Sequence, residues 1–264
     1  MRIGFRTAGF HQWPIDRALR ALGDLGYDGV EVCLEHPGCR PEGLTEAEAQ
    51  RQAQVCKEAG LSVASVSYHA DAEEPTTRRE TTIRGLDLVP AFGVEVYIVN
   101  GRRVDPQAPG QALRDLEALL DVLLPRASEL AVRIAVEPEP GLAVGSSADM
   151  QALLERRASP SLAVNLDVGH AFLTDPDVCA SVRCLGSAIA HTHLEGMPAG
   201  VHRHLLPGEG DLDLAGVCRA LTEIGYTGYG TIDLFDIADD PVGWARAALA
   251  PLRAIVAEAD DAAS

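Results

Sequence analysis

Short apolar, β-branched runs alternate along the whole chain with longer stretches whose apolar residues recur at helical spacing. In the stretch 113–124, leucines recur every three or four residues, as on the buried face of an amphipathic helix. Several of these stretches close with a glycine just before the next apolar run, which is a common helix end. The expected strands are Arg2–Arg6, Gly29–Leu34, Ser62–Ser67, Glu95–Val99, Val132–Glu137, Leu162–Asp167, Ala188–Leu194 and Gly230–Leu234.

This strict alternation predicts parallel strands joined by right-handed helical crossovers. Eight such units fit a closed (β/α)8 barrel, or TIM barrel, better than a doubly wound sheet, which usually has five or six strands. No composition shift and no Pro/Ser-rich linker divides the 264 residues, so we expect one α/β domain over residues 1–264. The Ala/Asp-rich end, residues 257–264, is expected to form a flexible tail.

Ionisable residues close four consecutive expected strands, at the barrel end where TIM-barrel proteins carry their chemistry. They are Glu137, Asp167, His193 and Asp233. Each alone has an ordinary explanation as a cap, a loop acceptor or a hydrogen-bonded core histidine. Three carboxylates gathered at one barrel end, however, repel one another and shift each other's pKa values, and a divalent cation removes that cost. We therefore expect these four residues to bind one divalent metal ion, with Mn, Mg, Co and Zn all compatible.

Composition narrows the function further. The formal net charge is −17, from 22 basic and 39 acidic residues, which disfavours binding to nucleic acid. Lys57 is the only lysine and falls in an expected helix, which argues against Schiff-base chemistry. No apolar run is long enough to cross a bilayer, no signal peptide is recognised, and six scattered cysteines without a CxxC pair are typical of reduced thiols. We expect a cytoplasmic protein without membrane partners.

Nearly the whole chain resembles the xylose-isomerase-like TIM-barrel proteins, and its second half carries the specific motifs. This group includes sugar isomerases and epimerases, inosose isomerases and dehydratases, and the endonuclease IV enzymes. The matching segments are Val136-Glu137-Pro138, Asp167-Val168-Gly169-His170, His191-Thr192-His193, the loop 207–213 and the stretch 224–233. The resemblance implies the same four metal ligands, with one departure, because the family usually has glutamate where this chain has Asp233.

The resemblance also implies roles for other residues. In the epimerases, the carboxylates on strands five and eight move a proton on opposite faces of an enediolate, so Glu137 is the expected base and Asp233 a ligand and possible second base. Aspartate is one methylene shorter, which changes its reach to a substrate carbon. The Trp13 ring is expected either to wall the apolar face of a sugar or to pack a helix. The residues expected to contact substrate are His69, His170, His191, Arg203 and Trp13.

The resulting hypothesis is a metal-dependent isomerase or epimerase of a small polyhydroxy carbonyl compound, with manganese favoured. Family analogy adds a carbohydrate-like substrate and a homo-oligomer. One alternative is a lyase that loses water or an aglycone from a related keto-polyol or oxidised glycoside. Another is an endonuclease IV-type nuclease, with His69 and His204 as additional zinc ligands, although strand four ends in Asn100 where the nuclease has histidine. A third alternative is a metal-stabilised scaffold without catalytic activity.

Overall fold

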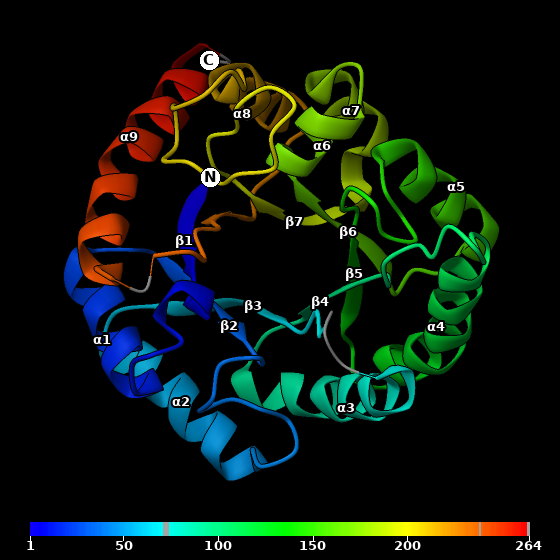
Figure 1. Ribbon diagram of the computed structural model, residues 1–264. Helices are drawn as coiled ribbons and strands as arrows, with labels where there is room; N and C mark the ends of the chain where they lie inside the picture. The colour runs from blue at the N-terminus through cyan, green and yellow to red at the C-terminus, as the bar shows by residue number, and fades with distance from the viewer. Residues whose placement is uncertain (71–73, 238, 263–264) are drawn as a thin grey trace.

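Eight parallel strands form a closed barrel in the computed structural model, which describes residues 1–70, 74–237 and 239–262. The strands follow one another around the barrel in chain order, and β8 pairs with β1 to close it. Figure 1 shows the strands as an inner ring surrounded by helices. The predicted single-domain TIM barrel is confirmed. The strands are β1 (Arg2–Arg6), β2 (Gly29–Cys33), β3 (Ser62–Ser67), β4 (Val96–Asn100), β5 (Arg133–Glu137), β6 (Leu162–Asp167), β7 (Ile189–His193) and β8 (Tyr229–Ile232).

The helices begin and end at residues whose local chemistry explains their limits. Thr45 and Glu48 form a reciprocal capping box at the start of α2, and α1 ends at Gly26 with φ of 91°, which favours glycine. The α-helices are α1 (Ile15–Leu25), α2 (Glu46–Glu58), α3 (Pro75–Leu88), α4 (Gln111–Glu129), α5 (Ser147–Arg157), α6 (Val168–Thr174), α7 (Val178–Leu185), α8 (Leu214–Glu223) and α9 (Pro241–Ala262). The described residues also form the 3-10 helices η1 (Thr7–Phe10), η2 (Val89–Phe92) and η3 (Gly186–Ala188).

The C-terminal segment differs from the expected flexible tail. Helix α9 continues to Ala262, and Ala259 is buried, so residues 257–262 belong to the folded domain. An alanine-rich sequence has high helix propensity, and here tertiary contacts hold it in place. The expected tail residues 263 and 264 lie outside the described residues.

Two apolar layers support the site. The larger layer fills the space between the strands and the helices, where the leucines of α4 and the β-branched residues of the strands are buried. The smaller layer lies inside the barrel and consists of Ile98, Ala135 and Ala163, with Val96 and Ala190 packed against it. Strands buried on both faces explain why the apolar runs show little alternation.

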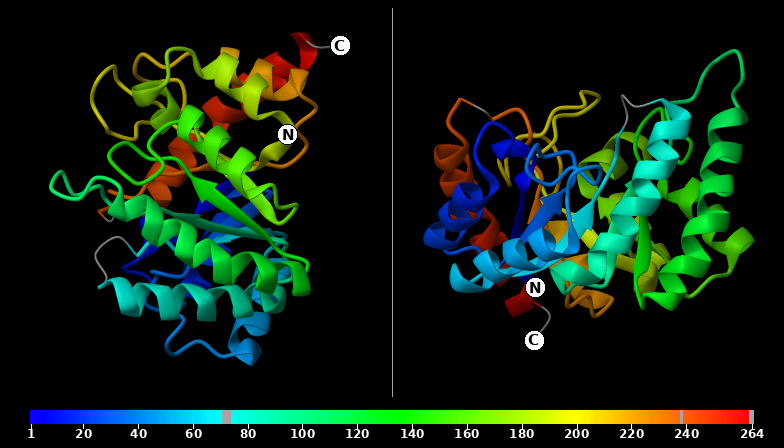
Figure 2. Two further views of the ribbon diagram at one scale, coloured as in Figure 1. Left: turned by 90° about the vertical axis from the view of Figure 1, so that its right-hand side faces the viewer. Right: turned by 90° about the horizontal axis from the view of Figure 1, so that it is seen from below.

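Different parts of the chain lie at the two ends of the barrel. The loops that follow the strands gather at one end, and the N-terminus and the end of α9 lie at the other end (Figure 2), where the Met1 amino group is 3.6 Å from the Asp260 carboxylate. Within the described part of the chain, no helix has the length and apolar character needed to cross a bilayer.

Candidate metal centre and substrate pocket

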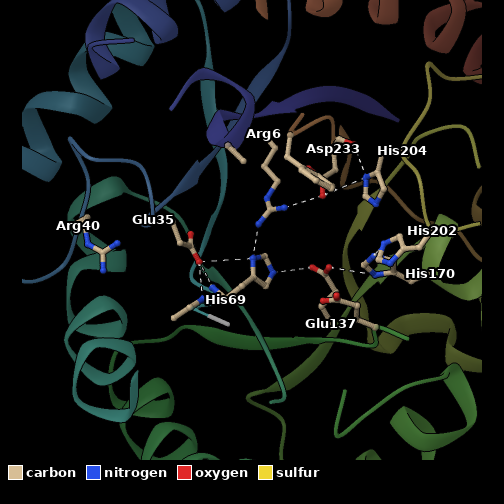
Figure 3. A pocket seen from close by; sticks show the side chains of 13 residues that line it. Arg6, Glu35, Arg40, His69, Glu137, His170, His202, His204 and Asp233 are labelled. Atoms are coloured by element: carbon tan, nitrogen blue, oxygen red, sulfur yellow. Dashed lines mark hydrogen bonds and ion pairs between the residues drawn. The ribbon is translucent and has the colours of Figure 1, made fainter. Parts of the chain in front are cut away.

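A cavity of about 450 Å³ opens at the carboxyl ends of the strands. Figure 3 shows it from close by, with ionisable side chains on several sides. The lining residues come from loops after most of the strands: Arg6, Ala8, Glu35, Arg40, His69, Ala70, Glu137, Glu139, His170, His202, His204, Asp233 and Phe235.

Three carboxylates converge on one nitrogen at the base of this cavity. The Nδ1 atom of His193 lies 3.5 Å from Glu137 Oε2, 3.6 Å from Asp167 Oδ2 and 3.9 Å from Asp233 Oδ2. All four residues are at most 2% exposed. Ligand atoms of Glu137, Asp167 and His193 all lie within 4.8 Å of one another, whereas Asp233 forms such a group with Asp167 and His204. Asp233 therefore stands at the edge of the set, consistent with its shorter side chain.

The donor set fits a divalent cation. Asp167 Oδ2 and Asp233 Oδ1 are buried and have no hydrogen-bond partner among the described residues. A buried carboxylate oxygen without a donor is costly unless a cation satisfies it. The other oxygen of Asp167 accepts a hydrogen bond from the backbone N–H of His170 at 2.8 Å and caps α6. One aspartate thus has one oxygen on the helix and one facing the candidate centre.

The pKa values show how strongly these groups interact. Burial alone would raise the pKa of Glu137, but the imidazoles of His69 and His193 outweigh it and lower the pKa to about 2. Burial also opposes ionisation of Asp167, and the neighbouring imidazoles of His170 and His193 nevertheless lower its pKa well below the usual value. For His193, burial lowers the pKa while Glu31 and Glu137 raise it, with a large net rise. Without a cation, a proton on His193 is what balances the carboxylates.

Glu195, which the sequence analysis did not single out, lies beside the same centre. It is fully buried and accepts a hydrogen bond from the backbone N–H of Gly169 at 2.8 Å. Burial raises its pKa well above the usual value, and the adjacent charge of Asp167 raises it further. In the sequence, Glu195 could have been recognised by its position two residues after His193, just beyond a buried strand.

Glu31 and Arg6 also belong to the site. Glu31 had no role in the sequence analysis, although a carboxylate in the middle of the apolar run Val30-Glu31-Val32 requires a partner. Arg6 ends β1 and lines the cavity. Its Nε donates to Glu31 Oε1 at 2.9 Å, and its Nη1 donates to Asp233 Oδ2 at 2.8 Å.

An arc of contacts connects the two candidate bases across the pocket (Figure 3). Arg6 joins Asp233 to the Nδ1 atom of His69, and His69 Nε2 lies 3.2 Å from Glu137 Oε2. Because a guanidinium only donates, His69 Nδ1 accepts from Arg6, and its Nε2–H donates to Glu137. Asn165 on β6 donates a second hydrogen bond to the same Glu137 oxygen at 2.5 Å. The Glu137 carboxylate is therefore fixed from two sides.

Three histidines form a second cluster above the carboxylates. Their ring nitrogens lie within 4.8 Å of one another, and His170 Nε2 is 3.0 Å from His202 Nε2. His170 Nδ1–H donates to the carbonyl of Pro138, and His204 Nδ1–H donates to the carbonyl of Asp233. The Nε2 atom of His170 therefore accepts from the Nε2–H of His202, whereas His204 Nε2 is buried and has no hydrogen-bond partner among the described residues.

The residues expected to contact substrate divide into two groups. His69 and His170 line the cavity. His191 does not, because the strand period places it one layer deeper, where its Nε2 lies 3.3 Å from Glu31. Arg203 is exposed and outside the lining, and Trp13 packs edge-on against Phe10 with the Arg17 guanidinium over its ring. These contacts are those of a residue that packs against helix α1.

Comparison with known proteins places the chain in a family. The model of the xylose isomerase-like TIM barrel matches residues 19–255. Fructoselysine 3-epimerase of Shigella flexneri is 23% identical, and the match covers 98% of the chain and 99% of that protein. A 3-dehydroshikimate dehydratase of Pseudomonas putida is 25% identical over 83% of the chain and 35% of that protein. The structure of an L-ribulose 3-epimerase superposes with a TM-score of 0.82 at 20% identity, covering 99% of this chain and 96% of that one. The chain belongs to the xylose isomerase-like TIM barrel family.

Proposed function

We propose that this protein is a divalent-metal-dependent isomerase or epimerase of a small polyhydroxy carbonyl compound such as a keto sugar. The convergence of Glu137, Asp167 and Asp233 on the Nδ1 atom of His193 carries the proposal. Two relatives with full or nearly full coverage are named as sugar 3-epimerases, which supports the same chemistry. Manganese is the favoured cation, and Asp167 and His193, with an oxygen each from Glu137 and Asp233, would hold it.

A bound divalent cation would polarise the substrate carbonyl and stabilise the negative charge of an enediolate. The chain's own residues supply the remaining steps. Glu137 has a low pKa, is ionised at neutral pH and faces the cavity, so it is placed to remove the proton from the carbon beside the carbonyl. His69, His170 and His204 line the cavity, where they are placed to contact substrate hydroxyl groups. In an isomerisation the protonated Glu137 then delivers the proton to the former carbonyl carbon, while the proton of the adjacent hydroxyl group passes to the former carbonyl oxygen.

The proposal is tested by solvent deuterium exchange. The metal-loaded protein is incubated in D2O with a panel of ketoses and keto sugar conjugates, and proton NMR follows the carbon next to the carbonyl. The expected result is deuterium incorporation together with a product of otherwise unchanged mass. Protein that binds Mn²⁺ but exchanges no carbon-bound proton in any member of the panel would count against the assignment.

A lyase is the second candidate, favoured by one contact. Arg6 holds Asp233 Oδ2 at 2.8 Å, which limits Asp233 as a second base, and an elimination needs only one. The similarity to a dehydratase over 83% of the chain points the same way. Mass spectrometry of the product separates the candidates, because elimination removes water or an aglycone whereas isomerisation conserves mass.

A further inference from the structure

A buried ion pair lies behind the candidate metal ligands. Arg6 at the end of β1 donates through Nε to Glu31 Oε1 on β2 at 2.9 Å. Glu31 is fully buried and Arg6 is 9% exposed. Burying two charges is unfavourable unless each finds further partners, so the partners of this pair show what it does.

Glu31 determines how His193 is turned. Its Oε2 atom lies 2.9 Å from His193 Nε2 and also accepts the hydroxyl of Ser65 at 2.9 Å. A carboxylate only accepts, so the Nε2 atom of His193 carries the proton that is donated to Glu31. The other ring nitrogen, Nδ1, is the one that faces Glu137, Asp167 and Asp233. A carboxylate behind a histidine in this way fixes the ring orientation and the nitrogen that is free to bind metal.

Arg6 determines how Asp233 is turned. The guanidinium presents its donors in one rigid plane, and Arg6 uses them toward Glu31, Asp233 and His69 at once. Its contact with Asp233 Oδ2 leaves Oδ1 buried and without a hydrogen-bond partner among the described residues.

We propose that Arg6 and Glu31 are positioning residues that together orient the ligands of the metal centre. Glu31 turns His193 so that Nδ1 faces the cation, and Arg6 turns Asp233 so that Oδ1 does. Their mutual contact couples β7 and β8, so a change in either residue disturbs both ligands. This inference rests on the proposed metal centre, but it concerns binding of the cation and not turnover.

The test measures Mn²⁺ affinity by calorimetry on the full-length protein after removal of metal. The variants are Glu31→Gln, which keeps the shape and loses the charge, and Arg6→Lys, which keeps the charge and loses the planar fork. Each is expected to weaken Mn²⁺ binding by about 10- to 100-fold. The double variant should lose less than the product of the two single losses, because the residues act as one unit.

Arg78→Lys is the matched control. Arg78 is also a buried arginine near the barrel mouth, and it donates to the backbone carbonyls of His69 and Asn100 and to the side-chain oxygen of Asn100. Its substitution should leave Mn²⁺ affinity within about twofold, well below the loss typical of residues behind a ligand. Circular dichroism and thermal melting confirm the fold of each variant. Wild-type affinity in folded Glu31→Gln and Arg6→Lys proteins would overturn the proposal.

A second measurement needs no variant. In Zn²⁺-loaded wild-type protein labelled with ¹⁵N at histidine, long-range proton–nitrogen correlations identify which ring nitrogen is protonated. The expected pattern for His193 is a proton on Nε2 and metal at Nδ1, and the reverse pattern would overturn the role of Glu31. Wild-type protein that binds neither Mn²⁺ nor Zn²⁺ would instead refute the metal centre itself, and with it the proposed function.

Discussion

Asp167 caps helix α6 through its Oδ1 atom, which accepts the backbone N–H of His170 at 2.8 Å, and leaves Oδ2 facing the candidate metal centre. The side chain of Asp167 can therefore be a helix cap and a metal ligand at the same time. Because α6 begins directly after β6, the cap also fixes the direction of the free oxygen.

This geometry separates fold from metal binding in the variant Asp167→Asn. Asparagine is as good an N-cap as aspartate, so metal-free Asp167→Asn should keep the helix cap and be more stable than metal-free Asp167→Ala. Its Mn²⁺ affinity should fall by more than about 100-fold, beyond the loss expected for a residue that only touches a ligand. Asp167→Ala, in contrast, should also lose about 1 kcal/mol of stability with the cap. Tight Mn²⁺ binding by Asp167→Asn, measured by calorimetry, would contradict the ligand assignment.

Glu137→Gln tests the base. The amide keeps the size of the side chain but cannot take a proton from carbon, so turnover should fall by roughly 10²- to 10⁴-fold. Deuterium exchange into substrate should fall in parallel, because both measurements report the same proton transfer. An active Glu137→Gln variant would transfer the base role to another residue. Glu139→Gln is the control, since Glu139 also lines the pocket but lies outside the converging set.

The pKa of His193 predicts how metal binding depends on pH. Burial lowers that pKa, but Glu31 and Glu137 raise it well above the ordinary value of 6.5. A raised pKa in the folded state contributes stability that is complete below 6.5 and is lost as pH rises through the folded-state pKa. The metal-free protein should therefore become less stable across this interval.

A bound cation replaces the His193 proton, so its stabilising effect should grow as that proton becomes easier to remove. The increase in Tm produced by saturating Mn²⁺ should be larger at about pH 8.5 than at about pH 6. Glu137 and Asp167, whose pKa values are lowered, stay ionised between these two pH values, so they do not contribute to the change in the Tm increase. A Tm increase that is constant across the range would show that His193 does not exchange its proton for the metal.

Metal content distinguishes the proposed enzyme from the nuclease alternative. One equivalent of metal per chain, measured by elemental analysis after dialysis, is expected for a single centre at His193. Three equivalents would favour the nuclease, with His69 and His204 as additional ligands. The structure already weighs against three, because Asn100 ends β4 and its side-chain amide donates to Glu139.

Most of the fold could be predicted because it follows from local features of the sequence. These features are the spacing of apolar residues and the glycines that end helices. The expected β1, β3 and β6 agree with the structure to the residue, and the other strands differ by one or two residues at an end. The expected strand Gly230–Leu234 is observed as Tyr229–Ile232, so Asp233 lies just beyond the strand. This difference matters, because a residue outside the ladder is free to turn toward Arg6.

The site was less predictable, since its outer members depend on packing between distant segments. Glu31 and His193 are separated by 162 residues, and no local pattern indicates that they touch. Arg203 lies in a loop whose path depends on the backbone bridge between Gly196 and Leu205, which hydrophobic periodicity does not encode. The two-residue period correctly places His191 on the same strand face as His193, but it does not encode depth within the barrel, and His191 lies beside Glu31.

The closeness of the two chain ends has a practical consequence. Met1 and Asp260 meet on the face opposite the cavity, so a short peptide joining the termini would leave the pocket entrance open. New ends could then be placed in an exposed helix–strand turn such as the one at Gly225, giving a circular permutant with the same eight strands. The same face offers a point for immobilisation on a solid support, with the substrate entrance directed into solution.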